Sequence, residues 1–192
     1  MPTYISFACF LKNGLCENLT GHLISPQSVP FLFILLQTGD ELAELLKRAL
    51  QIEDGFESVA QWEAYVMTKD HEFRRMIFQM LAESAKHKGM VGDLLKMVNV
   101  SSERQIAPLA PARFDFSGKE HLEIMDELYQ TEVLMLDTYT LIKESLTGSN
   151  IDNIPLKGRK EQFLKMLTEL ISDEGRHALM VSTHQGKMVR IR

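Results

Sequence analysis

Acidic and histidine side chains recur on the apolar faces of four segments with helical periodicity. Reading each segment at three- and four-residue spacing places a carboxylate near the middle of every apolar stripe, and two stripes also carry a histidine. An ionised carboxylate facing an apolar core costs several kcal/mol unless it is protonated, paired with a cation or bound to a metal. The residues in question are Glu53, Glu83, His87, Glu132, Glu174 and His177.

A shared metal centre explains these carboxylates better than ion pairs do. Lysine and arginine are nearly absent from the apolar stripes, so cationic partners are lacking. In antiparallel helices rising ~1.5 Å per residue, Glu53 and His87 reach one height, and so do Glu132 and His177. Taken alone, such a glutamate is more often a rim residue and such a histidine a hydrogen-bonded core residue. Only the joint pattern favours a metal.

Four helices must position these groups, and the first two have clear starting signals. Thr38 and Glu41 have the spacing of a capping box, which predicts a helix over about residues 40–68. Asp70 is a side chain of the type that caps helices, and it predicts a second helix over about 71–98. The link between these two helices is therefore only a few residues long.

The second pair of helices follows a much longer link. Ser117 and Glu120 repeat the capping-box spacing before a third helix that ends near Leu146, and a fourth is predicted over about 158–184. Short, long and short links favour two up-down pairs joined by a crossover, whereas three short loops would give a simple meander. The predicted fold class is all-α: a ferritin-like four-helix bundle with a long crossover between helices 2 and 3, plus an irregular N-terminal extension.

Length and composition indicate one globular domain. The chain has 192 residues, 45% hydrophobic and 24% charged, with a formal net charge of −5, which excludes a disordered chain and disfavours a nucleic-acid partner. No apolar stretch approaches the ~20 residues of a membrane helix and no secretory leader is evident, so we expect no membrane partner and a cytoplasmic location. The expected domains are an N-terminal extension at 1–39, the bundle at 40–186 and a basic tail at 187–192.

Two cysteines, Cys9 and Cys16, are too few for a four-cysteine metal site, so any metal must bind oxygen and nitrogen ligands. Glu174-Gly-Arg-His177 is a Glu-x-x-His on a helix. With an inward glutamate on each neighbouring helix, it resembles the ferritin-like di-iron carboxylate superfamily, and most closely its rubrerythrin-like branch. The resemblance covers about residues 40–184.

Two further patterns carry this resemblance. The segment 83–91 echoes the segment 173–181 around the two histidines, as the internal two-fold repeat of the family predicts. Glu132 followed seven residues later by Tyr139 is similar to the glutamate and outer tyrosine that the family carries on one helix. Tyr139 is thus implied to tune the site from outside the ligands, while Glu57, one turn from Glu53, could share or replace the role of Glu53.

The resemblance implies a cofactor and an activity. Two iron ions, with manganese or zinc as alternatives, would be held by carboxylates and imidazoles, with Glu174 as a bridge. The implied activity is that of a ferroxidase or peroxidase acting on ferrous iron with dioxygen or hydrogen peroxide. The rubredoxin-type module of rubrerythrins is missing, so an external electron donor is implied, together with a homodimer. The implied ligands are Glu53, Glu83, His87, Glu132, Glu174 and His177.

One position departs from the family pattern. The residue three before His87, where the family has a bridging glutamate, is Ser84, and serine is a poor iron ligand. Either Glu83 substitutes with altered geometry, or one iron position is weak or lost. A second hypothesis is therefore a degenerate bundle with one metal or none that serves as a scaffold or interaction module. A third, an oxygenase acting on an organic or tRNA substrate, is permitted by the fold.

Overall fold

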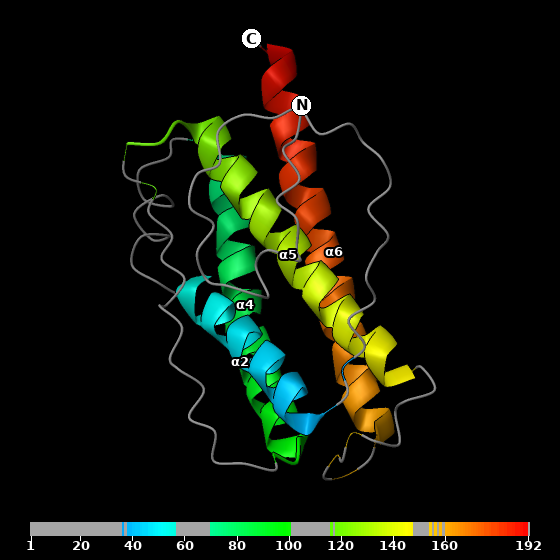
Figure 1. Ribbon diagram of the computed structural model, residues 1–192. Helices are drawn as coiled ribbons and strands as arrows, with labels where there is room; N and C mark the ends of the chain where they lie inside the picture. The colour runs from blue at the N-terminus through cyan, green and yellow to red at the C-terminus, as the bar shows by residue number, and fades with distance from the viewer. Residues whose placement is uncertain are drawn as a thin grey trace, which may run out of the picture. The chain divides into compact units, whose positions relative to one another are not determined.

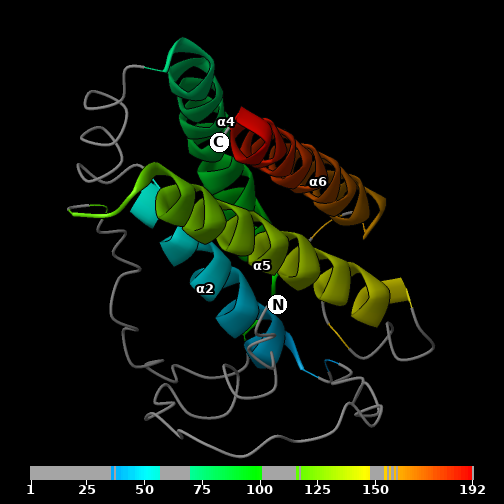
Figure 2. The ribbon, with the colours of Figure 1, turned by 90° about the horizontal axis from the view of Figure 1, so that it is seen from above.

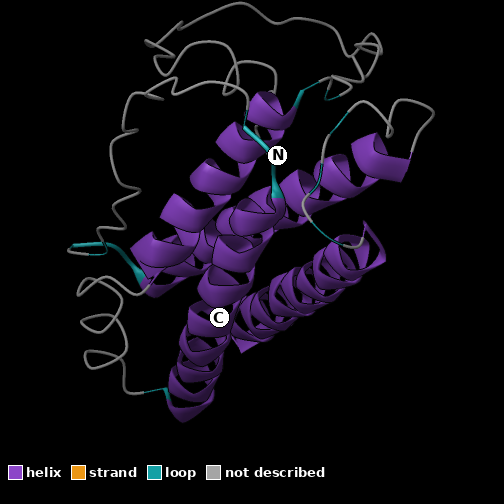
Figure 3. Ribbon diagram, turned by 90° about the horizontal axis from the view of Figure 1, so that it is seen from below, coloured by secondary structure: helices purple, strands orange, loops and turns teal. Residues whose placement is uncertain are grey.

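The structure of this chain, a computed structural model, describes residues 36, 38–56, 70–100, 116, 118–147, 154, 156, 158 and 160–191. These residues contain four α-helices: α2 (Gly39–Phe56), α4 (His71–Met97), α5 (His121–Thr147) and α6 (Lys160–Ile191) (Figure 1). No strand occurs among them (Figure 3), which confirms the predicted all-α class for this part of the chain. No helix of the described residues is long and apolar enough to cross a membrane.

Two of the predicted helix starts are confirmed by their hydrogen bonds. The backbone N–H of Thr38 donates to Oε2 of Glu41 at 3.1 Å, and the backbone N–H of Glu41 donates to Oγ1 of Thr38 at 3.2 Å, which is a reciprocal capping box. The side chain of Asp70 accepts hydrogen bonds from the backbone N–H groups of Glu72 and Phe73 and so caps α4.

The first helix is described only as far as Phe56, and the rest of its predicted span, 57–68, lies outside the described residues. The third and fourth helices differ from their predicted bounds. α5 begins at His121, because the backbone N–H of Glu120 donates to the Glu123 carboxylate at 2.8 Å and places this capping bond three residues later than predicted. Gly118 has a φ of 73°, a left-handed conformation that interrupts a helix before this point. α6 continues to Ile191, past the end predicted near residue 184.

The helix directions follow from contacts near the helix ends. α2 packs against α4 and α5 packs against α6, while contacts of α4 with α6 and of α2 with α5 complete the group (Figures 1 and 2). The start of α2 meets the residues after α4, since a Cβ added to Gly39 would lie 2.2 Å from the carbonyl oxygen of Asn99. α2 and α4 are therefore antiparallel, and glycine is required at this close approach.

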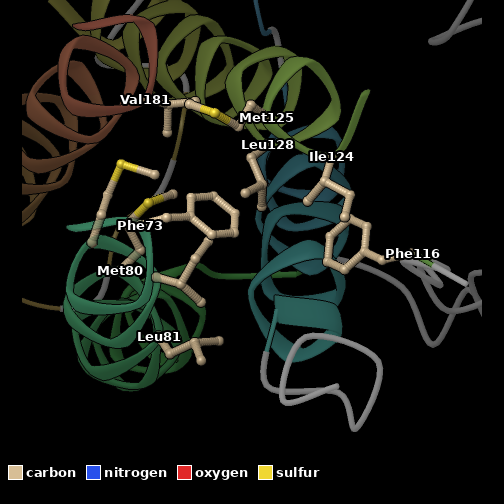
Figure 4. Close-up of a cluster of buried hydrophobic side chains, with 10 residues drawn as sticks. Phe73, Met80, Leu81, Phe116, Ile124, Met125, Leu128 and Val181 are labelled. Carbon is tan, nitrogen blue, oxygen red and sulfur yellow. The ribbon is translucent and has the colours of Figure 1, made fainter. Parts of the chain in front are cut away.

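α4 and α5 run in the same direction. The ring of Phe73 at the start of α4 lies 4.1 Å, centroid to centroid, from the ring of His121 at the start of α5. His184 in the last turns of α6 stacks on Phe73 with centroids 5.8 Å apart, so α6 is antiparallel to both. Phe73 belongs to the buried apolar cluster shown in Figure 4, whose other residues include Met80, Leu81, Phe116, Ile124, Met125, Leu128 and Val181.

Candidate metal centre

Five of the predicted site residues converge from all four described helices. Each is almost fully buried, with at most 3% of its surface exposed. α2 and α5 each supply one carboxylate, α4 supplies one imidazole, and α6 supplies both a carboxylate and an imidazole from adjacent turns of one face. The five residues are Glu53, His87, Glu132, Glu174 and His177.

The five side chains form two groups of three that share Glu174. In each group one ligand atom per residue lies within 4.8 Å of the others, a spacing that could hold a metal ion. In the first group, Nδ1 of His87 lies 2.9 Å from Oε1 of Glu174 and 3.6 Å from Oε1 of Glu53. In the second, Nδ1 of His177 lies 3.1 Å from Oε2 of Glu132 and 3.7 Å from Oε2 of Glu174. One oxygen of Glu174 therefore faces each imidazole.

The outer nitrogen of each histidine is held by an acid from the other histidine's helix. Nε2 of His87 is 3.2 Å from Oδ2 of Asp173 on α6, and Nε2 of His177 is 2.6 Å from Oε2 of Glu83 on α4. Asp173 precedes His177 by four residues, and Glu83 precedes His87 by four. A carboxylate on one ring nitrogen fixes the ring and leaves the other nitrogen as the ligand atom, which here is Nδ1.

The structure places the predicted ligand Glu83 outside both groups. Its side chain is 25% exposed, and its carboxylate accepts hydrogen bonds from Nη2 of Arg176 at 2.5 Å and from Nε2 of Gln79 at 3.0 Å. Burial raises the pKa of Glu83, but the hydrogen bonds from Arg176 and Gln79 outweigh burial and lower the pKa to about 2. The carboxylate is therefore an anion that orients His177 rather than a group facing Glu174.

Two neighbours fix Glu53. The hydroxyl of Ser84 donates to Oε2 of Glu53 at 2.6 Å, and the hydroxyl of Tyr139 donates to Oε1 of Glu53 at 3.0 Å. Both side chains are buried, so these bonds form out of water. The predicted outer tyrosine thus contacts the carboxylate of α2, and the predicted alternative Glu57 lies outside the described residues.

Burial and mutual contact displace the pKa values of the cluster in different directions. Burial raises the pKa of Glu53 and of Glu132, which favours their protonated forms. Burial alone would lower the pKa values of His87 and His177, but their hydrogen bonds to the carboxylates outweigh it and raise both to about 10. The pKa of Glu174 is lowered, because the two nearby imidazoles favour its anionic form by more than burial disfavours it. Without a metal, two imidazolium ions flank one carboxylate.

The donor set fits a metal. Oε1 of Glu174 is buried and accepts no hydrogen bond, although Nδ1 of His87 is 2.9 Å away. A buried, unsatisfied carboxylate oxygen is costly, and a cation at this point would satisfy it. No lysine or arginine is buried among the described residues, so the cluster has no permanent cationic partner inside the core. Carboxylate oxygen with imidazole nitrogen suits iron, manganese or zinc.

No family model matches this chain, and no curated protein or solved structure matches it either. Only the chemistry of the site therefore indicates a function. The sequence did not predict a role for Asp173, which contacts His87, or for Arg176, which donates to Glu83. The signal for Asp173 was its position four residues before His177, which repeats the spacing of Glu83 and His87.

Proposed function

We propose that this chain is a ferritin-like di-iron carboxylate protein with ferroxidase or peroxidase activity. The observation that carries the proposal is the position of Glu174, which turns one carboxylate oxygen toward His87 and the other toward His177. Glu53 and Glu132 close the two ends of this arrangement. A carboxylate shared by two groups of ligands is what a site for two adjacent ions requires, whereas a single ion needs only one group.

The helix directions also support a ferritin-like arrangement. α2 and α4 are antiparallel, α5 and α6 are antiparallel, and the starts of α4 and α5 lie together. α4 and α5 follow each other in the chain and run in the same direction, so the connection from the end of α4 to the start of α5 must run the length of the helices. A long crossover between the second and third helices of a bundle has this property.

The chain's own residues would prepare the site for this chemistry. Asp173 and Glu83 hold the rings of His87 and His177 so that Nδ1 faces the shared carboxylate. When bound, two ferrous ions supply the two electrons that one molecule of hydrogen peroxide needs for its reduction to water. Each imidazole must give up its Nδ1 proton before it can bind an ion, so loading releases protons.

Anaerobic titration with ferrous iron tests the proposal. We expect about two ions per chain, followed by a change in absorbance when hydrogen peroxide or dioxygen is added. The Glu174→Gln protein should bind neither ion, because Glu174 belongs to both groups of ligands. Glu169→Gln, on the same helix but exposed and paired with Lys86, is the matched control and should keep both ions. Equal iron binding by the two variants would contradict a shared role for Glu174.

A second candidate function, a bundle that retains one metal or none and serves as a scaffold, is favoured by one observation. Ser84 occupies the position of the family's bridging glutamate, and its hydroxyl donates to Oε2 of Glu53 at 2.6 Å. This bond engages an oxygen that would otherwise be open to a metal in the group of Glu53 and His87. The titration distinguishes the candidates, since one ion or none in the native chain supports the scaffold.

A further inference from the structure

A second group of metal-ligating side chains lies near the starts of α4 and α5. Asp70, His121 and His184 each offer one ligand atom, and these atoms lie within 4.8 Å of one another. Asp70 precedes α4, His121 is the first residue of α5, and His184 lies two turns beyond His177 on α6. At ~1.5 Å per residue, the group lies ~10 Å along α6 from the candidate di-iron site.

Asp70 is a carboxylate already fixed in place. Its Oδ1 accepts hydrogen bonds from the backbone N–H groups of Glu72 at 2.9 Å and of Phe73 at 3.1 Å. These bonds cap α4 and leave Oδ2 facing Nε2 of His184, 3.1 Å away. A ligand anchored by the backbone loses little freedom on binding an ion, which favours affinity.

His184 is also fixed in place, by burial, by ring stacking and by nearby carboxylates. Only 8% of its surface is exposed, and its ring stacks on Phe73 with an interplanar angle of 24°. Its Nδ1 lies 3.9 Å from Oε2 of Glu72, a carboxylate that accepts a hydrogen bond from Lys187 at 3.1 Å. The ring thus has one carboxylate on each side, which repeats the surroundings of both histidines in the candidate di-iron site.

His121 supplies the observation that points to a ligand. Its Nε2 is buried and has no hydrogen-bond partner. Its ring lies edge-on to Phe73 with centroids 4.1 Å apart, and 6.1 Å from the ring of His184. An unsatisfied buried nitrogen costs free energy, and a bound ion would satisfy it.

We propose that Asp70, His121 and His184 bind one divalent transition-metal ion, of which Zn²⁺ is the best fit. Two imidazoles and one carboxylate are a common ligand set for zinc and leave a fourth position for water. The ion ties the start of α4 and the start of α5 to the C-terminal half of α6. Binding to the folded chain alone therefore stabilises it by mass action. This site is independent of the proposed iron chemistry, because it shares no ligand with the other two groups.

The test uses the full chain with the candidate di-iron site disabled by Glu174→Gln and His177→Gln. In this background, equilibrium dialysis against Zn²⁺ should find one bound ion per chain, and Co²⁺ should give a visible spectrum of a site with nitrogen and oxygen ligands. Adding His121→Asn or His184→Gln should weaken binding by at least ~100-fold, more than the roughly 10- to 100-fold cost of losing an outer hydrogen-bond partner.

His71→Asn is the matched control. His71 is exposed, lies next to Asp70 on the same helix start, and contacts the side chain of Arg74 instead of the group. The control should bind Zn²⁺ as the background does. Equal binding by the His121→Asn and His71→Asn proteins would overturn the proposal, and so would a background that binds no Zn²⁺.

Circular dichroism verifies that each variant keeps its helices. Should the background unfold, the His121→Asn and His71→Asn substitutions are compared in the otherwise unchanged chain. The His121→Asn protein should then bind one Zn²⁺ ion per chain fewer than the His71→Asn protein. Adding Zn²⁺ should also raise the Tm of the His121→Asn protein by less. Identical ion counts and Tm shifts for these two proteins would reject the site.

Discussion

Oε2 of Glu83 on α4 lies 2.6 Å from Nε2 of His177 on α6, although the nearest histidine on the same helix as Glu83 is His87, one turn away. In the opposite direction, Oδ2 of Asp173 on α6 lies 3.2 Å from Nε2 of His87 on α4. Each acid thus orients the histidine of the opposite helix. This crossed pairing couples α4 and α6 at the level of the candidate metal centre, because neither ring can turn without breaking a hydrogen bond to the other helix.

Glu83→Gln should weaken metal binding without changing the number of ions. An amide can still accept a hydrogen bond from His177, but it no longer carries the charge that favours a proton on Nε2. We expect affinity to fall by roughly 10- to 100-fold, the usual cost of losing an outer carboxylate. Competition with a chelator measures this change, with Glu169→Gln as the control. A loss of one whole ion per chain would instead show that Glu83 is a ligand.

Ser84→Glu should raise metal binding and lower stability without metal. The new carboxylate would stand beside Glu53, where the serine hydroxyl now donates at 2.6 Å. A further buried acid disfavours the metal-free fold by about 2–4 kcal/mol, which denaturant unfolding measures. With iron, the ion count should reach two if the native chain binds fewer. Ser84→Ala removes the same hydrogen bond without adding an acid, and an equal gain of metal in both variants would contradict a ligand role for the new carboxylate.

The core positions of the candidate centre were predictable from the sequence because helical periodicity fixes which side chains face inward. Glu53, Glu132 and Glu174 interrupt apolar stripes, and the structure buries all three. The role of Glu83 was not predictable in this way. Spacing of four residues places it beside His87, but whether it contacts that ring or one on another helix depends on how α4 packs against α6.

The start of α5 and the group of Asp70, His121 and His184 could not be predicted from the sequence for a similar reason, because both depend on more than helical periodicity. The sequence predicts a capping box at Ser117 and Glu120, but Gly118 is left-handed and the capping hydrogen bond runs from the N–H of Glu120 to the Glu123 carboxylate. His121 lies at a helix end, where periodicity carries little information, and Asp70 serves as a cap whether or not it meets a histidine. Only the packing of α6 against the starts of α4 and α5 brings Asp70, His121 and His184 together.

Gly39→Ala and Gly92→Ala should change stability in opposite directions. A Cβ on Gly39 would lie 2.2 Å from the carbonyl oxygen of Asn99, so α2 would have to move from the end of α4 at a cost of about 1–3 kcal/mol. A Cβ on Gly92 meets no atom within 4 Å, and alanine is preferred inside a helix by about 0.5–1 kcal/mol. Thermal unfolding of both metal-free variants measures the difference. Equal stabilities would refute the close approach of α2 to Asn99.

The metal-free protein should lose stability as the pH rises from about 6.5 to 10. The pKa values of His87 and His177 are raised from 6.5 to about 10 in the folded chain, so in this range the folded state binds more protons than the unfolded state. Their contribution is complete below pH 6.5 and is lost as the pH passes about 10. Burial raises the pKa values of Glu53 and Glu132, which adds to the same trend above their ordinary value of 4.5.

Denaturant unfolding of the metal-free chain at several pH values between 6 and 10 measures this dependence. In His177→Gln the slope should be shallower, because one of the two raised pKa values is removed. The exposed His71→Gln is the control and should keep the slope of the native chain. Metal should also reverse the trend, since protons compete with the ion for Nδ1 and affinity rises with pH. A metal-free protein that becomes more stable toward pH 10 would contradict imidazolium ions paired with Glu174 in the core.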